Sequence, residues 1–345
     1  MRIGLVNDVA IALEALRRVV ASCPEHTVAW MARDGAEAVR CCAADPPDVI
    51  LMDLIMPVMD GVEATRHLVH AHPECAILVV TATVEGHLSR VFEAMGAGAL
   101  DAVNTPVLGA GGALVGGAEL LRKIAIVGRL SGVGGRGAAP SPRPPPKGAA
   151  AAEPAGSPPA RPWLVAVASS TGGPAALAAL LGEIPASCTA AIVVVQHVDV
   201  RFAPDLALWL GGHCRLPVRT IVPGMHPEPG AVLLAATNDH LWIDGAGALS
   251  YRETPRELFY RPSADVFFRA LAAGWPTPGA AVVLTGMGRD GAEGLLALRQ
   301  AGWWTAAQDA ASSVVHGMPG AAIELGAAGL VLPPAEIGRE LARLL

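Results

Sequence analysis

The stretch Asp48-Val-Ile-Leu-Met-Asp53 decides the fold of the first part of the chain, and Trp163-Leu-Val-Ala-Val-Ala168 decides that of the last part. Both are short, uninterrupted apolar runs, which is typical of strands buried on both faces of a parallel sheet. A polar residue of a predicted loop stands at the end of each run, Asp53 in the first and Ser170 in the second. Open α/β sheets place ligands and chemistry at the carboxyl ends of their strands. Asp53 and Ser170 are therefore the first candidate functional residues.

Around the first stretch, apolar runs alternate with segments of helical periodicity. This alternation predicts a parallel sheet with helices on both faces, and hence an α/β fold for a first domain at 1–125. The runs lie at 3–6, 28–32, 49–52, 77–80 and 100–103, and the helical segments lie at 11–20, 35–42, 61–69, 89–95 and 119–130.

The segment 126–161 is expected to be a linker. From Ser131 onward it is rich in Gly, Ala and Pro and has almost no large apolar side chain. Such a tract cannot bury enough surface to order itself, and its proline runs stiffen it in part. The chain of 345 residues is therefore predicted to hold two domains, 1–125 and 162–345.

The alternation resumes after the linker and again predicts an α/β domain, here with a doubly wound, mostly parallel sheet. The expected strands are 163–168, 190–196, 219–222, 280–284 and 303–307, and the expected helices are 174–181, 203–210, 263–273, 292–301 and 336–344. A small antiparallel insertion is expected near 230–252, with short strands at 231–235, 240–243 and 249–252.

Composition and charge narrow the classes of function. A net charge of −6 gives no basic surface for nucleic acid or an anionic membrane. The six cysteines lack C-x-x-C spacing and the density of a disulfide scaffold, so reduced cytoplasmic thiols are expected. The uncharged segment 162–182 could cross a bilayer by length, but its central Ser, Thr, Gly and Pro residues favour strand, turn and helix. We expect a cytoplasmic protein without direct membrane insertion.

Carboxylates follow two predicted strands of the first domain. Asp8 comes after the first strand and Asp53 after the third, so both are expected at one edge of the sheet. Phosphoryl transfer to a carboxylate needs a divalent cation beside it, and Mg²⁺ prefers carboxylate, carbonyl and water oxygens. The ends of these two strands can supply such a site, although Asp53 alone is also typical of an ordinary strand-ending cap.

The whole set of strand-end motifs resembles the receiver domain of response regulators. That resemblance covers roughly the first 125 residues and implies a flavodoxin-like fold. It also implies that Asp53 is the phospho-acceptor, that Asp8 and Asp53 are Mg²⁺ ligands, and that Thr81 is the switch hydroxyl. The motifs are Asp53-Leu-Ile-Met-Pro57, Asp60-Gly61, Thr81-Ala82 and Thr105-Pro106.

Two residues depart from the receiver pattern. Asn7 stands where the family has a second acid, so Mg²⁺ binding should be weaker by one formal charge. Thr105 replaces a Lys that pairs with the phosphoryl group in typical members. Phosphorylation of Asp53 is still expected, because Asp53, Asp8 and Thr81 all remain.

Ser170 is predicted at the tip of a strand-turn-helix, with the positive end of the helix that opens at Pro174 pointing at the turn. A serine nucleophile needs a base, and the base needs an orienting acid. His197 follows the strand 190–196 and Asp290 follows the strand 280–284, so three strands end in Ser, His and Asp. A Ser-Thr-Gly-Gly turn is also typical of a helix cap or a phosphate cradle, and these residues alone leave that alternative open.

The surrounding motifs resemble the catalytic domain of CheB, the chemotaxis protein-glutamate methylesterase family, over essentially 163–345. By position, the resemblance implies that Ser170 is the nucleophile, His197 the general base and Asp290 its orienting acid. It makes the backbone N–H of Met287 an oxyanion donor and Thr171 an assisting residue, and the spacing to Thr-Gly-Gly selects Ser170 over Ser169. The motifs are Ala168-Ser-Ser-Thr-Gly-Gly173, Val195-Gln-His197, Arg261-Pro-Ser-Ala-Asp265, Leu284-Thr-Gly-Met-Gly-Arg-Asp290 and Ala307-Gln-Asp-Ala-Ala-Ser-Ser313.

The resemblance further implies hydrolysis of glutamyl methyl esters on methyl-accepting chemotaxis receptors to glutamate and methanol, together with deamidation of receptor glutamines. A CheA-type histidine kinase is the implied phosphodonor, and the esterase site needs no cofactor. The unphosphorylated receiver is expected to cover the edge of the active site, and phosphorylation to loosen that contact. Asn7-Asp8 and Asn104-Thr105-Pro106 are most similar to the CheB-like branch of Wsp-type surface-sensing systems.

The sequence also allows two other hypotheses of function and one of a metal site. One is a non-enzymatic receiver, adaptor or phosphate sink with a relict esterase fold, which the presence of Ser170, His197 and Asp290 disfavours. Another is a general serine esterase with small soluble substrates. His67, His70 and His72 could form a metal cluster, but without a carboxylate or thiol at ligand spacing they are expected on the exposed end of a helix.

Overall fold

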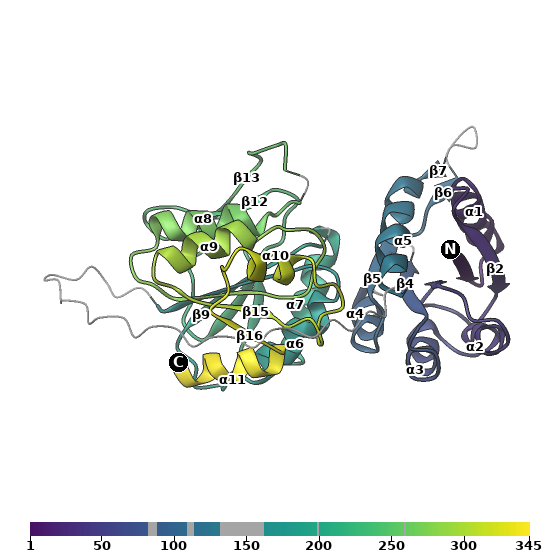
Figure 1. Ribbon diagram of the computed structural model, residues 1–345, viewed down its shortest axis with the longest axis horizontal. Helices are drawn as coiled ribbons and strands as arrows, with labels where there is room; N and C mark the ends of the chain where they lie inside the picture. Colours follow the sequence, from purple (N-terminus) through teal and green to yellow (C-terminus); the bar gives the residue numbers. More distant parts are fainter. Residues whose placement is uncertain (82–87, 109–113, 132–161, 199, 259) are drawn as a thin grey trace, which may run out of the picture.

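The computed structural model describes residues 1–81, 88–108, 114–131, 162–198, 200–258 and 260–345 (Figure 1). It contains two α/β units, which we call the N-terminal unit (1–131) and the C-terminal unit (162–345). Most of the predicted linker, 132–161, lies outside the described residues. Each unit is built on its own sheet, so the alternation of strands and helices in the sequence corresponds to two sheets.

The N-terminal unit has a five-stranded sheet in the order β2-β1-β3-β4-β5, and every neighbouring pair is parallel. This is the flavodoxin-like strand order. The helices α1 and α5 cover one face of the sheet, where Leu16 and Ile124 are buried, and α2, α3 and α4 cover the other, where Leu68 and Phe92 are buried. The elements are β1 (Arg2–Val6), α1 (Ala10–Ala21), β2 (Thr27–Ala32), α2 (Gly35–Ala44), β3 (Val49–Met52), α3 (Gly61–Ala71), β4 (Ala76–Thr81), α4 (Leu88–Gly96), β5 (Asp101–Asn104), β6 (Val107–Leu108), β7 (Leu114–Val115) and α5 (Gly117–Ser131).

The C-terminal unit has a seven-stranded parallel sheet in the order β10-β11-β9-β8-β14-β15-β16. The central strand β8 is buried on both faces, since its Val165 and Val167 contact one core and its Leu164 and Ala166 the other. The elements are β8 (Leu164–Ser169), α6 (Gly173–Gly182), β9 (Ala191–Gln196), η2 (Val200–Phe202), α7 (Ala203–Gly211), β10 (Val218–Thr220), β11 (Ala231–Leu234), β12 (His240–Ile243), β13 (Leu249–Arg252), α8 (Ala264–Gly274), β14 (Ala280–Val283), α9 (Ala292–Gln300), β15 (Trp304–Gln308), α10 (Met318–Glu324), β16 (Leu330–Leu332) and α11 (Pro334–Leu344).

The predicted antiparallel insertion is smaller than expected. Only β12 and β13 form an antiparallel pair in this region, whereas β11 joins the main sheet between β10 and β9. Three further features were absent from the prediction: the hairpin β6–β7, the seven-residue helix α10 and the edge strand β16. They are too short to show a period, and Leu330 and Val331 of β16 are exposed.

The two units contact each other through α4 and the start of β5 on the N-terminal side and through α6, α7 and the β8–α6 turn on the C-terminal side (Figure 1). Phe92 of α4 lies against Trp209 of α7, with ring centroids 6.2 Å apart. No helix in the described ranges is long and apolar enough to span a bilayer, and the segment 162–182 divides into β8, a turn and α6.

Candidate active site and phosphorylation site

Ser170 follows β8 directly and lies in the tight turn that leads into α6. Its side chain is nearly buried, with 8% exposed. Two glycines allow the turn: Gly172 has a φ of +76°, and a Cβ on Gly173 would lie 2.1 Å from Oε1 of Gln196. The turn therefore presents Ser170 at the carboxyl edge of the sheet with the N-terminus of α6 behind it.

The structure separates the roles of Ser169 and Ser170. The Ser169 hydroxyl is fully buried and donates to Oε1 of Gln196 at 2.6 Å, so its contact is a structural one between β8 and β9. The Nε2 group of Gln196 in turn donates to the backbone carbonyl of Ser170 at 2.9 Å. The Ser169 hydroxyl is therefore engaged with Gln196, and the choice of Ser170 as the nucleophile stays a prediction.

His197 and Asp290 are brought together although they lie 93 residues apart. The Nε2 atom of His197 is 2.8 Å from Oδ2 of Asp290, and each side chain is only 8% exposed. Burial acts to raise the pKa of Asp290, but the hydrogen bond and charge of His197, with donors from Ser263 and Ala264, outweigh it and lower the pKa. An ionised carboxylate can only accept, so Nε2 carries the proton of the neutral ring and Nδ1 carries the lone pair.

The second ring nitrogen of His197 is left without a hydrogen bond to any described residue. Nδ1 is buried and has no hydrogen-bond partner among the described residues. The ring stacks on Tyr260, with centroids 4.5 Å apart and planes within 6°. Ser169 of β8 pairs with Gln196 of β9 in the sheet, so Ser170 and His197 are the next residues at the ends of neighbouring strands. The Ser170 hydroxyl and His197 are not hydrogen-bonded to each other in this structure, which is common before substrate binds.

Gly286, which precedes Met287, lies close to Ser170. A Cβ on Gly286 would lie 2.8 Å from Cβ of Ser170 and 2.2 Å from Sδ of Met318. The backbone N–H of Ser170 donates to the carbonyl of Thr285 at 3.0 Å, which ties the two loops together. The predicted oxyanion donor therefore stands next in the chain to a residue in contact with Ser170.

Sequence reasoning gave no role to several residues of this site. Ser263 donates to Asp290, Tyr260 stacks on His197, and Gln196 holds the serine turn. Ser263 carried a detectable signal, since a serine just before an apolar helical segment is a typical N-cap. Tyr260 and Gln196 carried none, because their contacts depend on strand order.

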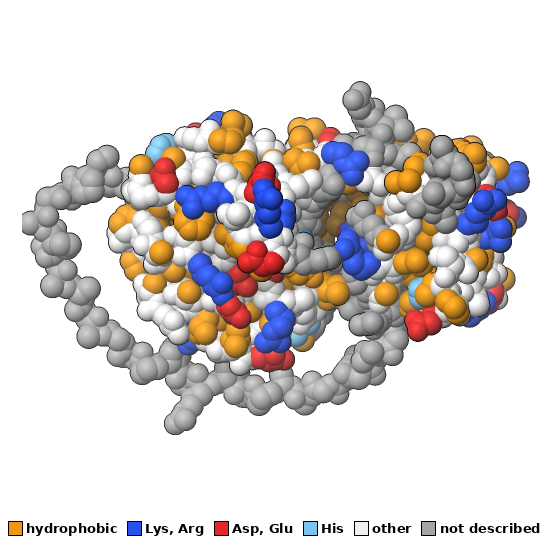
Figure 2. All heavy atoms as spheres, turned by 90° about the horizontal axis from the view of Figure 1, so that it is seen from above, with side chains coloured by type: hydrophobic (Ala, Val, Ile, Leu, Met, Phe, Trp, Pro, Cys, Tyr) orange, Lys and Arg blue, Asp and Glu red, His pale blue; other side chains and the backbone are white. Residues whose placement is uncertain are grey.

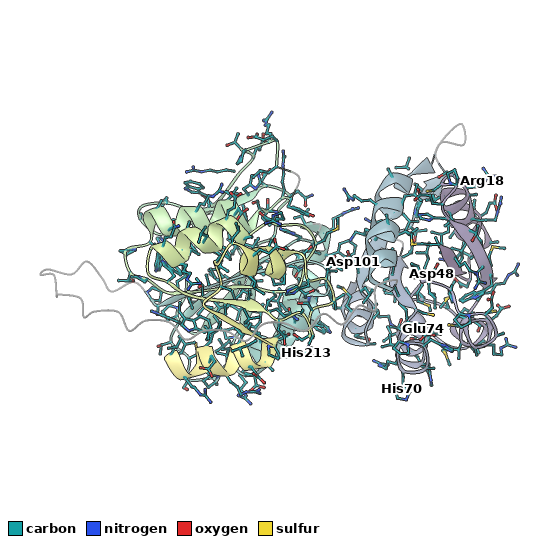
Figure 3. All side chains as sticks on the ribbon, viewed as in Figure 1. Arg18, Asp48, His70, Glu74, Asp101 and His213 are labelled. Atoms are coloured by element: carbon teal, nitrogen blue, oxygen red, sulfur yellow. The ribbon has the colours of Figure 1, made fainter. Side chains whose placement is uncertain are left out.

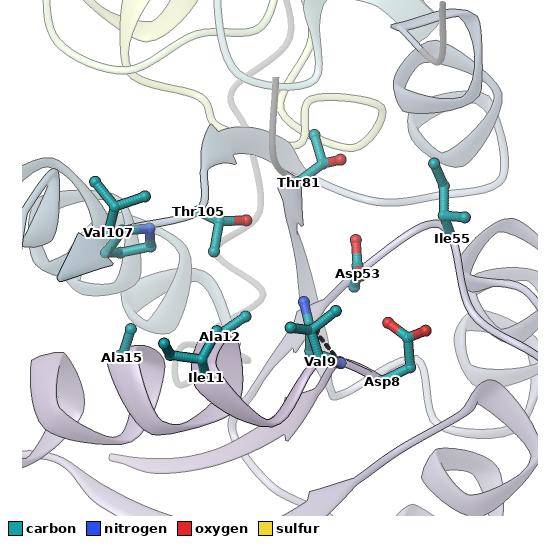
Figure 4. Close-up of a pocket in the computed structure, with 12 residues that line it drawn as sticks. Asp8, Val9, Ile11, Ala12, Ala15, Asp53, Ile55, Thr81, Thr105 and Val107 are labelled. Carbon is teal, nitrogen blue, oxygen red and sulfur yellow. Dashed lines mark hydrogen bonds between the residues drawn. The ribbon is translucent and has the colours of Figure 1, made fainter. Parts of the chain in front are cut away.

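The phosphorylation site predicted in the N-terminal unit is a pocket of about 560 Å³ at the carboxyl edge of its sheet (Figure 4). Asp8, Asp53, Thr81 and Thr105 line it, with an apolar wall of Val9, Ile11, Ala12, Ala15, Ile55, Pro106 and Val107. Burial, with a smaller contribution from the charge of Asp8, raises the pKa of Asp53 to about 6. Two carboxylates in a partly buried site, with no Lys or Arg among the described residues that line it, fit a hard divalent cation.

The two departures from the receiver pattern have visible consequences. Asn7 is nearly buried and its Oδ1 accepts the backbone N–H of Val9 at 2.9 Å, so its side chain closes the turn between β1 and α1. The Oγ1 atom of Thr105 is buried without a hydrogen-bond partner in the described part of the chain. Asp8 and Asp53 are therefore the two carboxylates left to hold Mg²⁺.

The N-terminal unit makes polar contacts with the turn between β8 and α6, which holds Ser170. Asp101, at the side of this unit that faces the C-terminal unit (Figure 3), accepts from Oγ1 of Thr171 at 3.2 Å. The carbonyl of Leu100 accepts from the backbone N–H of Gly172, also at 3.2 Å. Lys123 holds Asp101 in place at 2.7 Å. A cavity of only about 50 Å³ remains where this surface faces His197.

No other metal site is apparent within the described ranges, where no group of three or more His, Cys, Asp or Glu side chains could hold an ion. His67 and His70 are exposed on α3, and His70 points away from the unit (Figure 3). The surface shown in Figure 2 carries acidic and basic side chains side by side, without a broad field of one sign.

Comparison with known proteins covers both units. Residues 165–341 match the CheB methylesterase family, and residues 3–109 match the response regulator receiver domain. The chain is 53% identical over 344 residues to protein-glutamate methylesterase/protein-glutamine glutaminase 4 of Burkholderia thailandensis, covering 100% of this chain and 97% of the relative. It is 51% identical over 344 residues to the corresponding enzyme 3 of Pseudomonas aeruginosa, covering 100% and 99%. The catalytic domain of Thermotoga maritima CheB methylesterase superposes with a TM-score of 0.52 at 33% identity, covering 54% of this chain and 100% of that domain.

Proposed function

Because the chain belongs to the CheB methylesterase family, we propose that it is a phosphorylation-regulated enzyme that hydrolyses glutamyl methyl esters with Ser170, His197 and Asp290. The observation that carries this assignment is the buried pair of His197 and Asp290 at the strand ends beside Ser170. A relict fold that served only as an adaptor would have no need for this arrangement. The names of the relatives, which are enzymes, also favour hydrolysis.

The proposed chemistry follows from the tautomer of His197. The Ser170 oxygen attacks the ester carbonyl carbon while its proton passes to Nδ1 of His197, and Asp290 stabilises the resulting imidazolium. The imidazolium then protonates the departing methoxide, which leaves as methanol, and water hydrolyses the acyl-enzyme by the same proton path. The backbone N–H of Met287 would stabilise the oxyanion, and Thr171 would assist at the same turn. A glutamine side chain would follow the same route and release ammonia.

The expected substrate is a set of glutamyl methyl esters on cytoplasmic helices of chemoreceptors, and the expected phosphodonor is a histidine kinase. Both follow from the family and from the names of the relatives, which specify protein glutamate and protein glutamine. The protein would act in the cytoplasm on receptors in the membrane. Its place in a Wsp-type surface-sensing system stays a prediction.

The receiver would take its phosphoryl group on Asp53. Asp8 and Asp53 would hold Mg²⁺, which neutralises the phosphoryl oxygens when it is bound. Thr81 ends β4 in the same pocket and would follow the phosphate as the switch hydroxyl. The loss of a lysine at Thr105 leaves this chain more dependent on the cation.

Regulation would act through the contact between the two units. With Asp53 unmodified, Asp101 and the Leu100 carbonyl engage the side chain of Thr171 and the backbone of Gly172, next to the nucleophile. A protein helix carrying the ester could not reach Ser170 past this surface. Phosphorylation would favour a state in which the contact is released.

The test is release of methanol from methylated receptor membranes, with and without a small phosphodonor and Mg²⁺, by wild type, Ser170→Ala and Asp53→Ala. We expect Ser170→Ala to lose turnover by about three or more orders of magnitude, as removal of a serine nucleophile does in hydrolases. Asp53→Ala should keep the basal rate and lose the response to phosphodonor. Methanol release that survives Ser170→Ala would overturn the proposed chemistry.

A further inference from the structure

We propose that Ser263 and His240 are positioning residues that hold Asp290 in the orientation needed for its work with His197. This inference rests on the proposed function and extends its machinery beyond the three predicted residues. Both side chains are buried: Ser263 is 2% exposed and His240 is fully buried. Neither belongs to the strand ends from which Ser170, His197 and Asp290 arise.

Asp290 is held at both oxygens by the start of α8. Its Oδ1 accepts from the Ser263 hydroxyl at 2.6 Å and from the backbone N–H of Asp265 at 3.2 Å. Its Oδ2 accepts from the backbone N–H of Ala264 at 2.6 Å as well as from His197 at 2.8 Å. The carboxylate therefore sits at the positive end of a helix dipole, and its plane is set by donors on two sides.

Ser263 is itself held by His240. The Nε2 atom of His240 lies 2.9 Å from the carbonyl oxygen of Pro255, and a carbonyl can only accept, so Nε2 carries the proton. In the neutral ring Nδ1 is then an acceptor, and it receives the backbone N–H of Ser263 at 3.2 Å. A protonated His240 would direct a second N–H at that donor. The neutral tautomer of His240 thus fixes the backbone from which the Ser263 hydroxyl reaches Asp290.

The continuous series is Pro255, His240, Ser263, Asp290 and His197, and it links the small β12–β13 insertion to the catalytic base. Without the Ser263 hydroxyl, Oδ1 would lose its shortest bond and the carboxylate could turn away from His197. Without His240, the buried backbone N–H of Ser263 would lose its acceptor, and the start of α8 would be free to shift.

Other titratable groups surround this carboxylate and must be considered in any pH measurement. His197 faces it from the end of β9, Tyr260 from the loop before α8, and Asp265 from the first turn of α8. Arg289 is the neighbour in the chain and lines the same pocket of about 350 Å³. None of these residues is changed in the substitutions below.

The first experiment compares Ser263→Ala with Ser263→Thr in the full chain, activated by phosphodonor, with methylated receptor membranes as substrate. We expect Ser263→Ala to lower kcat by about ten- to a hundredfold, since a hydrogen bond to a charged group is lost, and to change KM little. The acid limb of its pH–rate profile should move to lower pH, because an imidazolium with a misplaced carboxylate forms less readily. Ser263→Thr keeps the hydroxyl and should restore both kcat and the profile.

The second experiment tests His240. His240→Leu removes both ring nitrogens and should reproduce the loss of kcat and the shift of the acid limb. His240→Asn keeps an acceptor near the Nδ1 position and should retain most of the activity. His226→Leu, in an exposed loop of the same region, is the matched control and should behave like wild type. If His240→Leu keeps the kcat and the pH profile of wild type, or only loses stability, His240 has no positioning role and that part of the inference is wrong.

The outcomes separate this inference from the proposed function. If Ser263→Ala keeps the kcat and the pH profile of wild type while Ser170→Ala abolishes turnover, Ser263 has no positioning role and the inference is wrong. If Ser263→Ala only lowers the melting midpoint, its role is structural and the inference is again wrong. If Ser170→Ala retains turnover, the proposed function itself fails.

Discussion

Asp53 shows how burial prepares a single residue for its predicted role. Its carboxylate shares a pocket with Asp8, and within the described part of the chain no Lys or Arg lines that pocket. Desolvation and the neighbouring charge raise the pKa of Asp53 to about 6. Without a bound cation, the ionised carboxylate therefore destabilises the folded state. A cation beside the two carboxylates would remove that destabilisation.

The sign of the pH dependence follows from this shift. An unfolded aspartate loses its proton near pH 4, whereas folded Asp53 loses it near pH 6, so between these values the folded state binds more protons. The contribution of Asp53 to stability is therefore lost as pH rises from about 4 to about 6. We predict that Asp53→Asn raises the melting midpoint of the N-terminal unit by a few degrees at pH 7.5 and changes it little at pH 4.

Calorimetry on the full chain, with and without Mg²⁺, checks this prediction. Mg²⁺ should raise the midpoint of wild type and leave that of Asp53→Asn nearly unchanged. Asp60→Asn is the control with opposite sign: burial acts to raise its pKa, but bonds from the Glu63 N–H and Arg90 outweigh it and lower the pKa. That variant should be less stable than wild type at pH 7.5. A lower midpoint for Asp53→Asn at that pH would contradict the argument.

At the level of secondary structure, α11 packs against α6, the helix that follows the turn with Ser170. Gly338 of α11 faces α6 so closely that a Cβ would lie 2.4 Å from the carbonyl oxygen of Leu180. A backbone carbonyl cannot move aside cheaply, so a side chain here must separate the two helices. The glycine is thus required by helix packing, although it weakens α11 as a helix.

We predict that Gly338→Ala destabilises the C-terminal unit by about 1–3 kcal/mol through overpacking, even though alanine is the better helix former. Gly274→Ala is the matched control, because Gly274 ends α8 and a Cβ there would meet nothing within 4 Å. That variant should be as stable as wild type or slightly more stable. Urea denaturation of both variants is the measurement, and equal stability of the two would exclude the packing argument.

At the scale of the whole molecule, the contact between the units combines an apolar centre with a polar end near the active site. Phe92 and Trp209 form part of the apolar contact. Asp101 forms the polar end, where it joins Lys123 of its own unit to Thr171 of the other. The apolar part would stabilise the contact between the units. Asp101 would fix the position of the N-terminal unit over the turn that holds Ser170.

We predict that Asp101→Ala raises the basal methanol release of the unphosphorylated full chain by about two- to tenfold, since one hydrogen bond of roughly 1 kcal/mol is removed from the closed state. The further increase on phosphorylation should shrink by the same factor. Glu74→Gln removes the same charge from an exposed position of the receiver and should leave both rates unchanged. An unaltered basal rate in Asp101→Ala would show that this contact does not restrain the enzyme.

Much of the fold could be read from the sequence, because a buried strand or an amphipathic helix is encoded by residues close together in the chain. The apolar runs before Asp53 and Ser170 correspond to β3 and β8, and the flavodoxin-like order of the first sheet is confirmed. The predicted meeting of His197 and Asp290 is also observed. It followed from parallel strands, whose carboxyl ends share one edge.

Contacts that depend on strand order and on the docking of the units could not be predicted from local patterns. Asp101 and Thr171 lie 70 residues apart, and no local pattern relates them. Ser263 contacts His240 because β12 packs against α8. A single buried histidine gives no periodic pattern in the sequence. The elements and the chemical groups at their ends could be predicted from short stretches of sequence, since both are local. Which of those groups hold one another in place was settled by packing, since it depends on all the elements at once.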